Sequence, residues 1–159
     1  MADLKDLEAR IRKLEDIEGI KRVKHKYFRS IDQGLWDDVG DCFAQEASVF
    51  DWGVFPGPTE VARRFKENVA PAYNLFVHHG HNPEIDLTSD TTAKGEWELE
   101  SFLLTAKTNI GFWITGIYHD EYVKEKAGWK IKNQKLDIFF WSDIEKGWAK
   151  ERFTPMPEA

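Results

Sequence analysis

Hydrophobic residues recur every three or four positions near the start of the chain. The stripe runs through Ile11, Leu14, Ile17, Ile20, Val23, Tyr27 and Ile31. This spacing places the apolar side chains on one face of an α-helix. We therefore predict one or two helices over residues 3–33, with Asp16 as the cap of a second segment and Gly19 as a point where the direction can change. Gly34 marks the end of the helix.

The residues around this stripe predict further short elements. Leu4 and Leu7 extend the apolar spacing toward the start of the chain, so residues 1–15 are expected to pack on the domain or on a neighbouring subunit. Asp37 then predicts the cap of a short helix, and the composition of residues 47–52 is typical of a strand.

A second helix and a set of long strands complete the pattern. After a turn at residues 53–58, Thr59 caps a helix that Pro71 ends. Aromatic-rich segments separated by short polar turns then predict four strands, at about 76–87, 92–106, 110–125 and 128–141. Such an antiparallel meander twists, so we expect it to curl around the helices and leave a conical hollow, an α+β fold.

The last part of the chain predicts a short helix. Ser142 and Glu145 have the spacing of a capping box, so a helix and a tail are expected over residues 142–159. With 159 residues, of which 42% are hydrophobic, the chain has the size of one domain, and we treat residues 1–159 as such.

Charge and cysteine content narrow the function. The formal net charge of -6 leaves no basic surface to neutralise phosphates, which disfavours nucleic acid as a partner. No run has the length of a membrane span, and no signal peptide is visible, so we expect a cytoplasmic protein. Cys42 is the only cysteine; it cannot form an internal disulfide, and we interpret it as a core residue.

Asp32 falls in the last turn of the predicted first helix, at the negative end of the helix dipole. A carboxylate there costs a few tenths to about 1 kcal/mol, and Lys or Arg would stabilise the helix better. A solvated turn residue is one interpretation of Asp32. The cluster from His78 to Asn82 favours another, because a carboxylate beside an imidazole forms a pair for proton transfer.

The histidines of this cluster lie on a predicted strand, where alternate side chains share a face. His78 then points into the hollow together with Phe76, while His79 and His81 point away from it. A one-residue slip in register would place His79 inside instead. Because the alternation divides the three histidines between two faces, and no carboxylate pattern completes a site, we expect no metal ion.

Other polar residues are candidates for the hollow. Tyr27 can donate its phenolic proton to a substrate oxygen, and Ser101 alternates with the apolar residues of its strand. Lys135 and Asp137 share a strand face and are weaker candidates, as is His119. The sequence offers no activated Ser or Cys, which disfavours covalent catalysis.

Several segments carry a resemblance to a known family. They are residues 16–21, 27–37, 78–85, 93–100, 116–122 and 128–131. Together they are similar to the SnoaL-like branch of the nuclear transport factor 2-like superfamily, and especially to its bile acid 7α-dehydratase and scytalone dehydratase members. The resemblance spans residues 16–141, and it implies an α+β cone with N-terminal helices packed in a strongly curved, mostly antiparallel sheet.

The resemblance also implies roles for individual residues. By position, Asp32 and His78 correspond to the catalytic pair of the family's lyases, with Tyr27 as a third member. The candidate substrate-binding residues are Trp36, Asp51, Ser101, Tyr118 and Lys135. Ser101 stands where the bile acid enzymes have an acid, a difference that bears on the substrate. Lyases of the family are commonly trimers, so we expect a homotrimer.

These patterns together predict a cofactor-independent lyase. Its reaction would be the dehydration of a hydrophobic polycyclic or aromatic alcohol by general acid–base catalysis. An isomerase or cyclase with the same pair is an alternative, as is a non-catalytic binding or assembly module on the same fold. We expect a small hydrophobic substrate, no cofactor, and neither nucleic acid nor a membrane as a partner.

Overall fold

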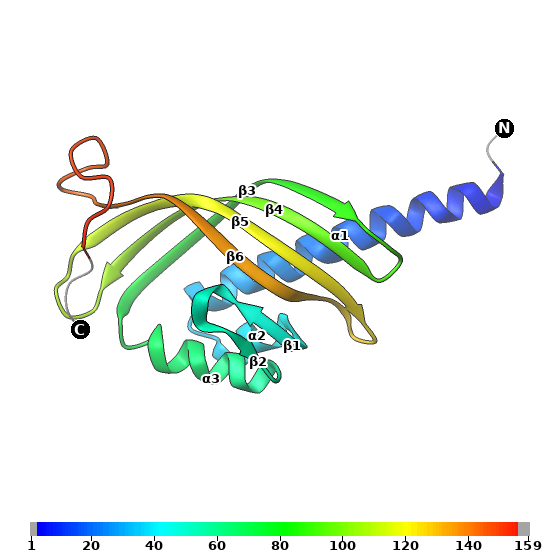
Figure 1. Ribbon diagram of the computed structural model, residues 1–159, viewed down its shortest axis with the longest axis horizontal. Coiled ribbons are helices and arrows are strands. Elements are labelled where there is room, and N and C mark those ends of the chain that lie inside the picture. Colours follow the sequence, from blue (N-terminus) through cyan, green and yellow to red (C-terminus); the bar gives the residue numbers. More distant parts are fainter. Residues whose placement is uncertain (1–2, 156–159) are drawn as a thin grey trace.

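The computed structural model describes residues 3–155, in which one curved sheet of six strands arches over the helices (Figure 1). The elements are α1 (Leu4–Asp32), α2 (Trp36–Asp41), β1 (Phe43–Val49), the 3-10 helix η1 (Phe50–Trp52), β2 (Val54–Phe55), α3 (Pro58–Asn68), β3 (Tyr73–Leu87), β4 (Thr92–Thr105), β5 (Gly111–Glu125) and β6 (Gly128–Asp143). This arrangement confirms the predicted α+β cone.

The four long strands of the sheet follow one another in space as they do in sequence. The strand order is β2-β1-β6-β5-β4-β3, and each pair from β3 to β6 is antiparallel. The predicted meander is therefore confirmed. The sequence analysis did not foresee that β1 pairs in parallel with β6, which extends the sheet on one side and leaves β3 as the edge on the other.

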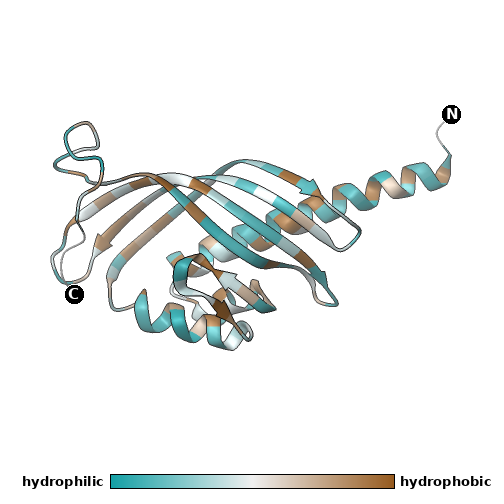
Figure 2. Cartoon of the chain, in the orientation of Figure 1, coloured by the Kyte–Doolittle hydropathy of each residue, from teal (hydrophilic) through white to brown (hydrophobic). Residues whose placement is uncertain are grey.

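The core lies on the concave side of the sheet. Every second residue of β4, from Ala93 to Thr105, is buried, and Figure 2 shows the matching alternation of hydrophobic and hydrophilic residues along the strands. Cys42 is fully buried among this core, as predicted. Burial raises the pKa of its thiol to about 12, so the residue is a poor nucleophile.

Helix α1 is continuous from Leu4 to Asp32, so of the predicted one or two helices the structure has one, without a break at Gly19. Asp16 does not cap a second helix; its Oδ1 atom accepts hydrogen bonds from Trp129 Nε1, at 2.8 Å, and from Lys124 Nζ, at 2.5 Å. Gly19 lies one turn later, where a Cβ would come within 2.9 Å of the Trp129 ring. The glycine therefore makes room for an indole that packs on the helix.

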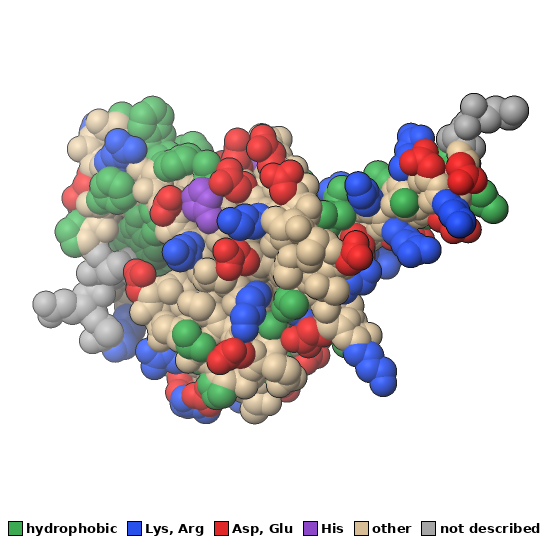
Figure 3. All heavy atoms as spheres, turned by 45° about the vertical axis from the view of Figure 1, so that its right-hand side comes forward, with side chains coloured by type: hydrophobic (Ala, Val, Ile, Leu, Met, Phe, Trp, Pro, Cys, Tyr) green, Lys and Arg blue, Asp and Glu red, His purple; other side chains and the backbone are tan. Residues whose placement is uncertain are grey.

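The first part of α1 extends beyond the sheet (Figure 1). Its apolar residues are exposed: Leu4, Leu7, Ile11 and Leu14 have exposed fractions of 69%, 41%, 55% and 63%. This part of the predicted stripe is therefore not buried by another element of the described chain, and the expected homotrimer stays a prediction. Lysine, arginine and acidic side chains are interspersed on the face in Figure 3. None of the described helices is long and apolar enough to cross a membrane.

The predicted helix after Ser142 is wrong within the described residues. Strand β6 continues to Asp143, because Phe112 and Asp143 still pair across β5 and β6, and turns follow at residues 144–150. Asp143 Oδ1 accepts a hydrogen bond from the Glu145 N–H group, a turn contact rather than a helix cap. Residues 156–159 of the predicted tail lie outside the described residues.

A close contact between α2 and α3 provides a test of this packing. A Cβ atom at Gly40 would lie 2.3 Å from the carbonyl oxygen of Pro58. Gly40→Ala should therefore lower the free energy of unfolding by about 1–3 kcal/mol, although alanine is the better helix former. Urea unfolding measures this change, with the exposed neighbour Asp41→Ala as a control that stays within about 0.5 kcal/mol of the wild type. An equally stable Gly40→Ala variant would contradict the contact.

Candidate active site

The end of α1 meets the edge strand β3 through one carboxylate. Asp32 is the last residue of α1, and the chain turns away at Gly34, which has a φ of +66°. The Oδ1 atom of Asp32 lies 2.6 Å from His78 Nδ1, and its Oδ2 atom accepts the His78 backbone N–H at 3.0 Å. Both carboxylate oxygens are thus used by one residue, which fixes the ring and leaves Nε2 for a substrate.

Two phenyl rings hold the imidazole of His78 from either side. Phe28 and Phe76 stack on it with ring centroids at 5.6 and 5.2 Å and interplanar angles of 10° and 15°. Gly80 makes this arrangement possible, because a Cβ there would lie 2.4 Å from the Phe28 ring. The imidazole therefore has its orientation set by packing as well as by Asp32.

His78 forms part of the wall of a cavity between the sheet and the helices. Its volume is about 230 Å³, which is below the range of about 300–1,000 Å³ for pockets that hold drug-sized ligands. Most of the wall is aromatic or aliphatic: Ile31, Phe50, Trp52, Val69, Tyr73, Phe76, Leu99, Leu103, Ile114, Leu136 and Trp141. The cavity therefore suits a small hydrophobic ligand.

Two buried polar atoms at this wall have no hydrogen-bond partner among the described residues. They are the Oγ atom of Ser101 and the Nε1 atom of Trp141. Ser101 is the direct cross-strand partner of His78, and Ile114 of β5 pairs with both Ser101 and Trp141. Unpaired buried polar groups are costly, so these atoms are places where a ligand oxygen would gain hydrogen bonds.

A pair of tyrosines adds a hydroxyl to the same cavity. Tyr27 of α1 and Tyr118 of β5 are both buried, line the cavity, and have their ring centroids 6.5 Å apart. Burial raises the pKa of both hydroxyls well above the ordinary value, so both stay protonated at neutral pH. Each hydroxyl therefore carries a proton that it can donate to a substrate oxygen.

A buried ion pair lies behind the tyrosines. Lys24 Nζ contacts Asp120 Oδ2 at 2.6 Å, with both side chains fully buried, and lies 3.6 Å from the ring centroid of Tyr118. Asp120 Oδ2 also accepts the Tyr122 hydroxyl at 2.7 Å. Burial lowers the pKa of Lys24 to about 8, and the charge of Asp120 offsets part of that effect.

Five of the predicted site residues come together here. Tyr27, His78, Ser101 and Tyr118 line the cavity, and Asp32 holds His78. The predicted register of β3 is the one in the structure, since His79 and His81 are exposed. Sequence reasoning missed Lys24, although it lies four residues from Ile20 and from Phe28 on the apolar stripe of α1. It also missed Phe28 and Trp141.

The other predicted residues do not reach the cavity. Trp36 begins α2 and contributes to the outer part of the core, and Asp51 is exposed on η1. Lys135 is exposed because the pairing of β5 and β6 shifts by one residue between Glu121 and Tyr122, which reverses the sides of the following β6 residues. His119 also lies outside, beside Asp137.

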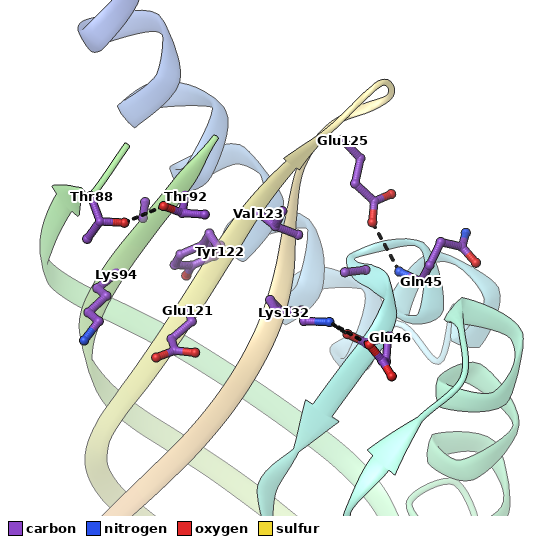
Figure 4. A pocket seen from close by; sticks show the side chains of 12 residues that line it. Gln45, Glu46, Thr88, Thr92, Lys94, Glu121, Tyr122, Val123, Glu125 and Lys132 are labelled. Atoms are coloured by element: carbon purple, nitrogen blue, oxygen red, sulfur yellow. Dashed lines mark hydrogen bonds and ion pairs between the residues drawn. The ribbon is translucent and has the colours of Figure 1, made fainter. Parts of the chain in front are cut away.

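A larger hollow of about 480 Å³ lies beside the β5–β6 hairpin (Figure 4). Several polar side chains of its lining pair with one another or with backbone. Lys132 Nζ lies 3.4 Å from Glu46 Oε2, and Glu125 Oε1 accepts the Gln45 N–H at 3.2 Å. The wall of this hollow contains no histidine. We therefore place the candidate active site at the smaller, apolar cavity.

Comparison with known proteins gives a consistent picture. Residues 12–135 match the sequence profile of the SnoaL-like domain. A type 2 hexachlorocyclohexane dehydrochlorinase, LinA, superposes with a TM-score of 0.75 at 18% identity, covering 84% of this chain and 92% of that chain. A scytalone dehydratase candidate from Novosphingobium aromaticivorans gives 0.73 at 22% identity, covering 83% and 89%. At these identities the structural likeness shows a shared fold.

The buried ion pair generates a stability prediction. Lys24→Met should lower the free energy of unfolding by about 3–5 kcal/mol, because it leaves the Asp120 carboxylate buried without a cation. Adding Asp120→Asn should recover much of this loss, since the neutral amide needs no counter-ion. Urea unfolding of the two single variants and the double variant gives the coupling free energy.

The exposed pair of Lys26 on α1 and Asp38 on α2, at 2.8 Å, provides a matched control, since Lys26 lies on the same helix as Lys24. Lys26→Met should cost no more than about 1 kcal/mol, because an exposed pair is screened by water. Strictly additive losses for Lys24→Met and Asp120→Asn would contradict the coupling of the buried pair.

Proposed function

The chain belongs to the SnoaL-like domain family, and from this premise we propose that it is a cofactor-independent lyase, a dehydratase of small hydrophobic alcohols. The observation that carries the proposal is the contact between Asp32 and His78 at the wall of an apolar cavity. An imidazole with Nδ1 held by a carboxylate is a general base at Nε2.

The reaction begins with proton abstraction. His78 Nε2 takes a proton from a carbon next to an electron-withdrawing group, and the negative charge of Asp32 stabilises the imidazolium that forms. The electron pair of the broken C–H bond forms the new C=C bond as the C–O bond breaks. The leaving hydroxide takes up a proton from the imidazolium and departs as water.

The substrate oxygen needs donors where negative charge develops. The hydroxyls of Tyr27 and Tyr118 at the cavity wall supply such donors, and the unpaired Ser101 Oγ and Trp141 Nε1 atoms supply further contacts. The volume of about 230 Å³ favours the aromatic end of the predicted substrate class, with one or two rings, over a large polycyclic alcohol.

The isomerase, cyclase and non-catalytic alternatives each predict a different product or a different structure of the site. An isomerase or cyclase would employ the same pair, and its product would keep the oxygen. The non-catalytic alternative predicts a filled hollow, or Asp32 and His78 facing outward. The open cavity and the 2.6 Å contact between the two side chains favour the enzyme instead.

We expect turnover to depend on both members of the pair. In a screen of one- and two-ring alcohols with a carbonyl group near the hydroxyl, mass spectrometry should show loss of water from an accepted substrate. On that substrate, His78→Ala and Asp32→Asn should each lower kcat by about 100- to 10,000-fold, because general base catalysis is lost.

His119→Ala is the matched control, since it removes an exposed histidine from the outer face and should leave kcat unchanged. Retained turnover in both His78→Ala and Asp32→Asn would show that the mechanism is wrong. A product of unchanged mass that still requires both residues would instead support the isomerase or cyclase alternative.

A further inference from the structure

Two histidines and a glutamate converge on the outer face of the sheet, away from the cavity. His79 and His81 project from the same side of β3, and Glu100 of β4 is the direct cross-strand partner of His79. His79 Nδ1 and His81 Nε2 each lie 3.8 Å from Glu100 Oε2, and the three ligand atoms lie within 4.8 Å of one another. We propose that these residues form a surface site for a divalent transition-metal ion, with Zn²⁺ as the best match.

The geometry is close to that of a tetrahedral zinc site. Bonds of about 2.0–2.2 Å to nitrogen and oxygen place neighbouring ligand atoms about 3.4 Å apart. Small rotations of the exposed histidine side chains and of Glu100 would bring their ligand atoms from the observed separations to this spacing. Three protein ligands leave the fourth position for water, and two imidazoles favour zinc and its neighbours over Mg²⁺ or Ca²⁺.

The carboxylate of Glu100 is already oriented toward the histidines. Trp113 Nε1 donates a hydrogen bond to its Oε1 atom at 3.2 Å, so Oε2 is the oxygen that faces both rings. Outer partners of this kind commonly orient metal-binding carboxylates. The neighbouring acid on the same face, Glu98, is bound by Asn82 Nδ2 at 2.7 Å. Glu100 is therefore the carboxylate available to the site.

The alternation along the histidine strand, together with the lack of a carboxylate pattern to complete a site, led us to expect no metal ion. It placed His79 and His81 on one face correctly, but the acid that completes the set comes from β4. His119 shows why proximity of a histidine to acids is not sufficient. Its Nδ1 atom faces Glu96 at 2.9 Å and its Nε2 atom faces Asp137 at 3.2 Å, so the two acids lie at different ring nitrogens and do not converge with the ring on one ion.

Titration calorimetry with ZnCl₂ in a buffer that does not chelate metals tests the proposal. We expect one ion per chain for the wild type. The double variant His79→Ala/His81→Ala, which lacks two of the three ligands, should bind at least about 100-fold more weakly, and Trp113→Phe about 10-fold more weakly. His119→Ala, the matched loss of an exposed histidine, should bind like the wild type.

Two further readouts do not depend on catalysis. Co²⁺ should give a tetrahedral absorption spectrum with the wild type and not with the double variant. Zn²⁺ should raise the Tm of the wild type and leave that of the double variant unchanged, because the ion binds the folded state. Without metal, similar circular dichroism spectra of the two proteins would show that the exposed substitutions leave the fold intact.

Equal zinc affinity of the wild type and the double variant would overturn the proposal. An equally large loss of affinity in His119→Ala would also overturn it, since binding would then depend on histidine content rather than on this site. These outcomes are independent of the proposed dehydratase activity, because no substrate is used and the site lies on the opposite face of the sheet.

Discussion

The position of α1 against the concave face of the sheet is the constraint on which the site depends. Two side chains of α1 tie it to strands that lie apart in the sheet: Lys24 to Asp120 of β5, and Asp32 to His78 of β3, each at 2.6 Å. A buried lysine tolerates little displacement from its counter-ion, because an unpaired charge in the core costs several kcal/mol. The deep pair thus fixes the helix along its axis, and the carboxylate at its end reaches His78 as a consequence.

The negative charge of Asp32 is unfavourable at the C-terminus of a helix, and its contacts with His78 offset this cost. Its two oxygens accept one backbone N–H and face one imidazole nitrogen, contacts that replace water as the helix end is covered by β3. Phe28 and Phe76 then enclose the imidazole between apolar faces. A carboxylate that serves helix stability poorly therefore positions an imidazole at the edge of an apolar cavity.

The features that could be predicted from the sequence were those set by local periodicity. The strand alternation that placed His78 inside works because β3 pairs without a register shift from Leu75 to His81, the two shifts lying between Tyr73 and Leu75 and between His81 and Glu84. Lys135, a candidate for the hollow, lies outside it, because a shift in the β5–β6 pairing precedes the residue and reverses its side. Lys24 was missed because its partner Asp120 lies 96 positions away, and only the fold brings a charged residue on an apolar stripe to its counter-ion. The capping box at Ser142 failed because pairing with β5 extends the strand through it.

The composition of the cavity wall bears on the course of the proposed reaction. Its titratable side chains are His78 and three tyrosines, and burial raises the pKa of Tyr27, Tyr73 and Tyr118. The tyrosines therefore act as neutral hydrogen-bond donors, and His78 is the side chain of this wall that the proposed reaction uses as its base. The imidazole that removes the proton from carbon must also be the acid that protonates the departing oxygen. Both bonds then break on the side of the substrate that faces His78, so the arrangement of the wall favours elimination from a single face.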